Sequence, residues 1–127
     1  MKQVLVDTSI WVDHFQRRNV ALVQLLLADR VITHPMVQGE LACGTPPAPR
    51  TQTLRDLALL RQSQQATLPE TLALIEREKL YGLGCGLVDF VLLASALITP
   101  HAELWTADKR LAALCVRFGV NHAAVGH

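Results

Sequence analysis

The sequence contains few of the features that mark membrane-spanning, secreted or disordered proteins. Its longest apolar stretch, residues 87–98 (LVDFVLLASALI), contains an aspartate and is shorter than the roughly 18 residues of a membrane span. The apolar run after Met1 ends at Asp7, which is too short for a signal-peptide core. Only 18% of the residues are charged, 50% are hydrophobic, and no low-complexity tract occurs, so a disordered chain is excluded. We therefore expect a cytoplasmic protein without a membrane segment.

Cysteine is also scarce. The three cysteines, Cys43, Cys85 and Cys115, are far apart and form no CxxC pair. This number and spacing suggest neither a disulfide framework nor a zinc site. We interpret them as small core residues of a protein in a reducing compartment.

The length of 127 residues suits a single domain, which we expect to cover residues 1–127. Short apolar runs at residues 3–6 (QVLV), 31–33 (VIT) and 104–105 (LW) predict buried strands. Longer stretches with helical spacing separate these runs. Strands that alternate with helices indicate an α/β fold with a parallel sheet between helical layers.

The helices are predicted from spacing and from residues that break them. Two helical faces are suggested by Leu54, Leu57, Ala58 and Arg61 and by Leu72, Ile75 and Lys79. The prolines of residues 45–49 (TPPAP) require a loop, and the glycines of residues 81–86 (YGLGCG) precede a buried helix over residues 87–98. A last helix lies within residues 107–120, ended by Gly119. From Asn121 the chain either adds a short strand or frays.

Four carboxylates stand where strands end or helices begin: Asp7, Glu40, Asp89 and Asp108. Because the carboxyl ends of parallel strands meet at one edge of a sheet, we expect these side chains to converge. Clustered carboxylates repel one another and require a cation, and ligands that are all oxygen favour Mg²⁺ or Mn²⁺. Such ions activate water and neutralise the charge of a phosphodiester, so the pattern indicates a metal-dependent nuclease.

Each acid also has a structural interpretation. Asp7 and Asp108 suit the N-caps of the following helices, and Glu40 suits a solvated surface position. Asp89 is harder to explain in this way, because no other Asp, Glu, Lys or Arg lies between residues 80 and 103. A lone buried carboxylate costs several kcal/mol, and the start of a helix offsets only part of that cost. Both interpretations stay open at the other three positions.

The charge balance depends on where the acids lie. The formal net charge is +1, from 12 basic and 11 acidic residues. With four acids at one metal site, 12 basic residues face 7 acidic ones, a net charge of +5. Such a surface attracts polyanions such as RNA.

Four blocks of the sequence resemble the PIN-domain ribonucleases, in particular the toxins of VapBC toxin–antitoxin pairs. The blocks are VDTSIWVDHF (6–15), HPMVQGELACG (34–44), VDFVLLASAL (88–97) and LWTADKRL (104–111). They occur in family order over nearly the whole chain. The resemblance implies a three-layer α/β/α sandwich around a short parallel sheet. It also implies an Mg²⁺- or Mn²⁺-dependent endoribonuclease that cleaves RNA, such as tRNA or ribosomal RNA, and is silenced by a cognate VapB-like antitoxin.

The resemblance also assigns the site. It implies that Asp7, Glu40, Asp89 and Asp108 form the metal-binding acidic quartet, with Thr8 or Ser9 and Thr106 as assisting hydroxyls. In the mechanism we hypothesise, a metal held chiefly by Asp7 and Asp89 positions and deprotonates a water for in-line attack, and a second ion, if present, stabilises the leaving oxygen. Glu40 and Asp108 ligate directly or orient waters on the metal. Thr106 alternatively caps the last helix.

Two expectations about other residues follow. His14 and His34 are interpreted as structural or surface residues, because the mechanism needs no histidine base. We expect Asp7→Asn or Asp89→Asn to abolish cleavage. Because either change relieves carboxylate repulsion, we also expect the metal-free variants to melt no lower than the wild type.

The resemblance implies two protein partners, a second copy of the chain and the antitoxin. Antitoxins of this family lay a helix or an extended tail into a groove near the first helices. Ile10, Trp11 and Phe15 lie on consecutive turns of the first predicted helix. They line that groove or belong to the core, as the apolar face of an amphipathic helix does.

Two other functions were weighed. An aspartate after the first strand also suits aspartyl-phosphate chemistry, but a phosphatase of that kind needs a second aspartate where this chain has Ser9. Receiver domains need an acidic pair before the first helix and a late lysine, which are not evident. The alternative that we retain is a catalytically weak PIN-like module that binds RNA or protein.

Overall fold

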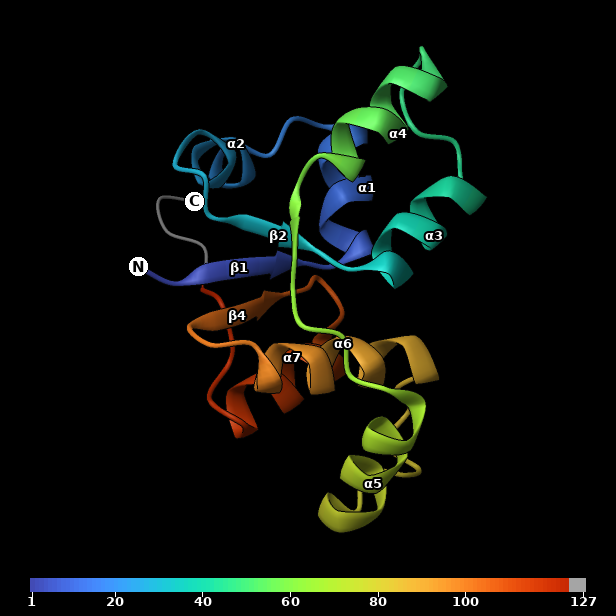
Figure 1. Ribbon diagram of the computed structural model, residues 1–127, viewed down its shortest axis with the longest axis vertical. Coiled ribbons are helices and arrows are strands. Elements are labelled where there is room, and N and C mark those ends of the chain that lie inside the picture. Colours follow the sequence, from blue (N-terminus) through green and yellow to red (C-terminus); the bar gives the residue numbers. More distant parts are fainter. Residues whose placement is uncertain (124–127) are drawn as a thin grey trace.

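A four-stranded parallel sheet between helices forms the centre of the computed structural model, which describes residues 1–123 (Figure 1). The strands are β1 (Gln3–Val6), β2 (Val31–Thr33), β3 (Arg61–Gln62) and β4 (Ala102–Trp105). The helices are α1 (Thr8–Gln16), α2 (Val20–Leu27), α3 (Pro35–Cys43), α4 (Arg50–Ala58), α5 (Leu68–Glu78), α6 (Leu87–Ile98) and α7 (Lys109–Arg117).

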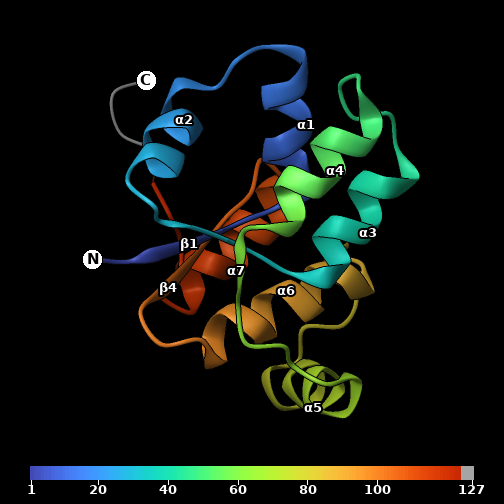
Figure 2. The same cartoon turned by 45° about the horizontal axis from the view of Figure 1, so that its top comes forward.

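The helices divide into two layers. The strand order is β3-β2-β1-β4, and every neighbouring pair is parallel. Helices α1 to α4 lie on one side of the sheet and α6 and α7 on the other, with α5 packed outside α6 (Figures 1 and 2). The predicted three-layer α/β/α sandwich is therefore confirmed.

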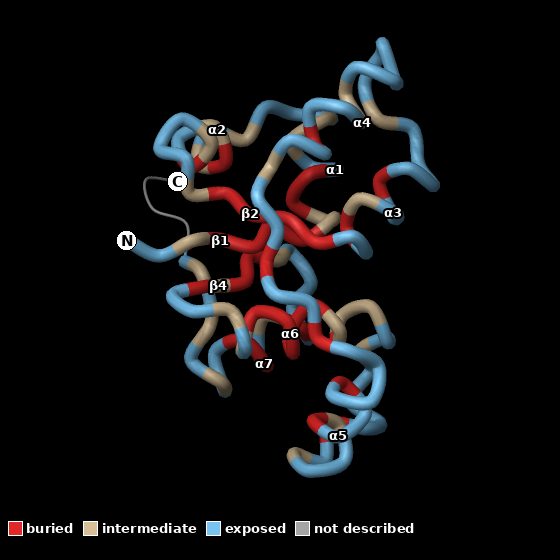
Figure 3. The backbone as a smooth tube through the Cα atoms, viewed as in Figure 1, coloured by how far each residue is buried: buried red, intermediate tan, exposed pale blue. Residues whose placement is uncertain are grey.

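The core is built around β1 and α6. Val4, Leu5 and Val6 are fully buried, because β1 is paired on both edges and covered on both faces. Leu92 and Leu93 of α6 are also fully buried, and Figure 3 shows the buried residues gathered along the central strands and α6. The apolar runs at residues 3–6 and 87–98 thus have the structures that the sequence predicted.

The connections produce a switch in strand order beside β1. From β1 the chain moves outward to β2 and β3, then returns to the other side of β1 as β4. The helix after β1 lies on one face of the sheet and the helix after β4 lies on the other (Figure 1). In parallel sheets, ligands bind at such a switch in strand order, beyond the carboxyl ends. Asp7 directly follows β1, and Thr106 directly follows β4.

Two predicted helical faces were wrong in part. Helix α4 ends at Ala58, and Arg61 begins β3, a two-residue exposed strand paired with β2 by its backbone. In α5 the buried residues are Thr71 and Leu74, whereas Leu72 is half exposed. Lys79 caps the C-terminus of α5 with φ 55°. The packing of α5 on α6 selects the buried face, which helical spacing alone does not reveal.

The predicted breaks occur as expected. Residues 45–49 and 81–86 lie outside helices, α7 ends at Arg117, and Gly119 has φ +71°. Asn121 forms a single parallel bridge with Leu104 rather than a strand, and residues 124–127 lie outside the described residues. Over residues 1–123, the helices lack the combined length and apolar character needed to cross a bilayer.

Candidate functional site

Asp7 is held by three hydrogen bonds at the carboxyl end of β1 and is only 6% exposed. Its Oδ1 accepts from the backbone N–H of Thr8 (2.8 Å). Its Oδ2 accepts from the hydroxyl groups of Ser9 (2.8 Å) and Thr106 (2.7 Å). Because Thr106 follows β4, the last bond joins the ends of two neighbouring strands. Asp7 is the N-cap of α1, but capping uses only one of its two carboxylate oxygens.

The loop between β4 and α7 is fastened to the same carboxylate. The Ser9 hydroxyl accepts from the backbone N–H of Ala107 (3.0 Å), and the Thr106 hydroxyl accepts from that of Asp108 (3.0 Å). Asp108 is the N-cap of α7, since its Oδ1 accepts from the N–H groups of Arg110 (2.9 Å) and Leu111 (3.0 Å). Two of the three hydroxyls predicted from the sequence, those of Ser9 and Thr106, therefore connect Asp7 to the loop that bears Asp108.

Glu40 approaches from α3. Its side chain is exposed, as the surface interpretation expects, but its Oε1 accepts from the Thr8 hydroxyl (2.7 Å). Thr8 is the first residue of α1 and adjoins Asp7. The third predicted hydroxyl thus ties Glu40 to the start of α1.

Asp89 lies in the first turn of α6, where its Oδ2 accepts from the backbone N–H of Gly86 (3.0 Å). Burial raises the pKa of Asp89, while the Gly86 hydrogen bond lowers it. The negative charges of Asp7 and Asp108 raise this pKa further. Asp89 is therefore near enough to two other acids for their charges to act on it.

The donor atoms suit a hard cation. The four carboxylates and three hydroxyls offer only oxygen, the ligand that Mg²⁺ and Mn²⁺ prefer. Each carboxylate accepts a hydrogen bond from a neighbouring hydroxyl or amide. With the side chains in these positions, no three acidic, histidine or cysteine residues between 1 and 123 lie close enough to hold one ion. Hydrogen bonds through Thr8, Ser9 and Thr106 link the surroundings of Asp7, Glu40 and Asp108, and charge links Asp89 to Asp7 and Asp108, but the four carboxylates do not form a closed ligand shell.

A model of the PIN domain family matches residues 4–116, a span that contains all seven of these side chains. The chain belongs to the PIN domain family. The sequence is 44% identical over 117 residues to Ribonuclease VapC32 from two strains of Mycobacterium tuberculosis. The match covers 92% of this chain and 94% of that protein. The VapC-like resemblance that the sequence motifs indicated is confirmed.

The two predicted structural histidines of this PIN domain have backbone partners. The Nδ1 of His34 accepts from the N–H of Met36 (3.0 Å), so His34 is the N-cap of α3, and burial lowers its pKa. The Nδ1 of His14 accepts from the N–H of Asn19 (3.0 Å). These bonds support a structural role for both residues.

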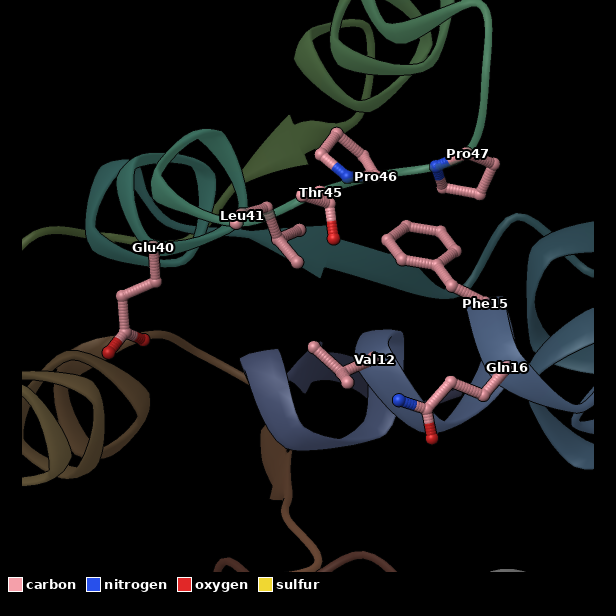
Figure 4. Close-up of a pocket in the computed structure, with 9 residues that line it drawn as sticks. Val12, Phe15, Gln16, Glu40, Leu41, Thr45, Pro46 and Pro47 are labelled. Carbon is pink, nitrogen blue, oxygen red and sulfur yellow. The ribbon is translucent and has the colours of Figure 1, made fainter.

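A groove of about 380 Å³ leads away from Glu40 between α1 and the loop after α3. We call it the α1–α3 groove, and it is lined by Val12, Phe15, Gln16, Glu40, Leu41, Gly44, Thr45, Pro46 and Pro47. Figure 4 shows Glu40 at one end and Phe15 with Pro47 at the other. Of the three residues considered for an antitoxin groove, Ile10 and Trp11 belong to the core, at 5% and 4% exposure. Phe15 lines the groove.

The backbone groups at this site were not predicted from the sequence. The N–H of Gly86 binds Asp89, and the N–H of Ala107 binds Ser9. Amides carry no residue-specific signal, so only the position of Gly86 just before a buried helix hinted at its role.

Proposed function

We propose that the chain is a VapC-type toxin, an Mg²⁺- or Mn²⁺-dependent endoribonuclease of a type II toxin–antitoxin pair that acts in the cytoplasm as a single PIN domain over residues 1–127. The observation that carries this proposal is the hydrogen bond between Asp7 and Thr106, which joins the ends of β1 and β4, together with the bond from the Asp108 N–H to Thr106 and the charge effect of Asp7 and Asp108 on Asp89. The similarity to Ribonuclease VapC32 supports RNA as the substrate. A role in protein or RNA binding alone would not require acids from four separate elements to be linked by hydrogen bonds and charge in this way.

The protein's own residues orient the acids. Ser9 and Thr106 fix the plane of the Asp7 carboxylate, and Gly86 fixes Asp89 at the start of α6. The Thr8 hydroxyl donates to Glu40 and so holds this side chain beside the start of α1, next to Asp7. Hydroxyl and amide donors of this kind set the direction in which a carboxylate offers its remaining lone pairs.

We propose Asp7 and Asp89 as the main metal ligands. Glu40 and Asp108 ligate directly or hold waters bound to the metal. When bound, the ion supplies an activated water and neutralises charge on the phosphodiester. To hold one shared ion, these carboxylates would have to give up some of their present hydrogen bonds.

The direct test is cleavage of purified bacterial tRNA and ribosomal RNA by the full chain. We expect discrete cuts with Mg²⁺ or Mn²⁺, no cuts with EDTA, and recovery when Mg²⁺ is added in excess. The cut ends are mapped by sequencing. RNA that is shifted on a native gel but never cleaved would overturn the nuclease proposal and favour the binding module.

We also propose that the chain forms a homodimer and that a VapB-like antitoxin occupies the α1–α3 groove. The groove is mainly apolar and ends at Glu40, so a segment lying in it would reach the acids. Truncating Phe15 to Ala removes the aromatic wall of the groove. We expect this variant to bind the cognate antitoxin roughly 10- to 30-fold more weakly, as measured by calorimetry, because buried aromatic anchors dominate such interfaces.

Phe118→Ala is the matched control. Phe118 is also partly buried, but it lies at the end of α7 beneath the Arg117 guanidinium, away from the groove. We expect both variants to cleave RNA at wild-type rates in the absence of antitoxin. Equal antitoxin affinity of Phe15→Ala and Phe118→Ala would contradict this placement.

A further inference from the structure

Arg110 lies flat against a glycine of the loop before α6. Its Nη1 points at the carbonyl oxygen of Gly84, 3.5 Å away. A Cβ atom built on Gly84 would lie 2.9 Å from Nη1 and 3.0 Å from both Cδ and Cζ of Arg110. Gly84 also has φ +89°, which other residues rarely adopt. The absence of a side chain at Gly84 is therefore what allows Arg110 to occupy this position.

The position of Arg110 is electrostatically unusual. It lies in the first turn of α7, where the helix dipole disfavours a cation. Its side chain is exposed, and within residues 1–123 no carboxylate oxygen lies within salt-bridge distance of it. Neither the helix dipole nor a direct ion pair with a described residue therefore stabilises the Arg110 guanidinium at this position.

The surroundings of Arg110 are those of the candidate site. Asp108 precedes it by two residues and accepts from its backbone N–H. Cys85 adjoins Gly84; burial raises the pKa of its thiol, the charges of Asp89 and Asp108 raise this pKa further, and the charge of Arg110 lowers it. Arg110 is thus a cation beside the candidate acids, between the start of α7 and the loop that precedes α6.

We propose that Arg110 binds a phosphate of the RNA beside the cleaved bond, and that Gly84 lacks a side chain in order to seat this guanidinium. The inference rests on the proposed ribonuclease function and adds a substrate-binding residue to it. Carboxylates repel a phosphodiester, so a cation beside them is needed to hold the strand. Apart from the long bond from Nη1 to the Gly84 carbonyl oxygen, the N–H donors of the Arg110 guanidinium have no carboxylate partner among the described residues and can donate to phosphate oxygens.

The first experiment measures binding of a single-stranded RNA to the full chain carrying Asp89→Asn, which prevents cleavage. Adding Arg110→Ala should weaken binding roughly 10-fold and lower the slope of log Kd against log[salt] by about 0.7, the value for one lost phosphate contact. Arg110→Lys should restore the slope but only part of the affinity. Arg55→Ala, an exposed arginine on α4 in the other helical layer, is the control for charge loss alone.

The second experiment separates the contact between Arg110 and Gly84 from the backbone strain that any side chain causes at a glycine with positive φ. Gly82 and Gly84 both have positive φ, but a Cβ on Gly82 would meet nothing within 4 Å. We expect Gly82→Ala and Gly84→Ala to lower the melting temperature alike, and only Gly84→Ala to weaken RNA binding. In the Arg110→Ala background, Gly84→Ala should cause no further loss of affinity, because the two changes act through one contact.

The outcomes distinguish this inference from the proposed function. If the wild-type chain cleaves RNA while Arg110→Ala leaves both affinity and salt slope at the values of Arg55→Ala, the phosphate contact is refuted and the nuclease stands. Equal RNA affinities of Gly82→Ala and Gly84→Ala would refute the role of Gly84 in positioning Arg110. If the wild-type chain cuts no RNA, the nuclease fails, and the binding measurements still decide whether Arg110 contacts RNA.

Discussion

Asp7→Asn is expected to reduce metal-dependent RNA cleavage more than roughly 100-fold and to lower the melting temperature as well. The loss of activity follows because the variant removes a charged ligand, and each 1.4 kcal/mol of lost transition-state stabilisation costs about tenfold in rate. The loss of stability follows from the three hydrogen bonds to a carboxylate that is only 6% exposed. An asparagine has one acceptor oxygen and presents an NH₂ group to the hydroxyls of Ser9 and Thr106, at a cost of roughly 1–3 kcal/mol.

The predicted loss of stability replaces the expectation from the sequence, that metal-free Asp7→Asn melts no lower than the wild type. That expectation considered only carboxylate repulsion, whereas the structure adds the hydrogen bonds that the charged form accepts. Cleavage is measured with Mg²⁺, and stability by thermal unfolding in EDTA. A variant with full activity, or one that melts above the wild type, would contradict the role given to Asp7.

Asp29→Asn is the control for both measurements. Asp29 precedes β2 and therefore lies at the amino edge of the sheet, opposite the site. Its φ of 56° suits asparagine, which tolerates the left-handed region better than most residues. We expect this variant to cleave RNA at the wild-type rate.

Asp89→Asn is expected to abolish cleavage to a similar degree while the metal-free protein melts no lower than the wild type. The asparagine oxygen can still accept from the Gly86 N–H. The pKa of Asp89 is raised in the folded state by burial and by the charges of Asp7 and Asp108, so ionising this carboxyl opposes folding. Removing the charge removes that cost.

The pH dependence gives the sign of this effect. A carboxyl with a raised folded-state pKa reduces stability as the pH rises from its unfolded value, about 3.9, through the folded value. Below that pH window the Asp89 carboxyl is neutral in both the folded and the unfolded wild type. Above it, the folded wild type carries the full free-energy cost of the ionised carboxylate. The stability of Asp89→Asn relative to the wild type should therefore increase through this window and then level off, as measured by urea unfolding in EDTA. A relative stability that falls with rising pH would contradict the raised pKa of Asp89, which burial causes first and the charges of Asp7 and Asp108 increase.

Much of the candidate site could be proposed from the sequence, because strand ends carry a clear signal. The run QVLV is buried on both faces and is followed at once by a carboxylate, and the fold then sends the ends of parallel strands to one edge. Asp89 stood out because it interrupts an apolar helix. The chain order of the four blocks was enough to indicate the PIN family, which the family match confirms.

Other features gave no usable signal. Strand β3 is two residues long and exposed, so its pairing with β2 depends on backbone hydrogen bonds rather than on apolar residues. Helix α2, with the apolar sequence VALVQLLL, was not assigned, because its spacing does not separate a helix from a buried strand. The buried face of α5 depends on α6, which follows it in the chain.

By itself, the sequence determined the α/β class, the buried strand and central helix, and the acids that belong at one edge of the sheet, because burial patterns and chain breaks are local properties. Only the tertiary structure decided that β4 pairs with the free side of β1, that Ser9 and Thr106 donate to Asp7, and that Arg110 packs against Gly84. These depend on distances between residues as many as 99 positions apart, which no local pattern encodes.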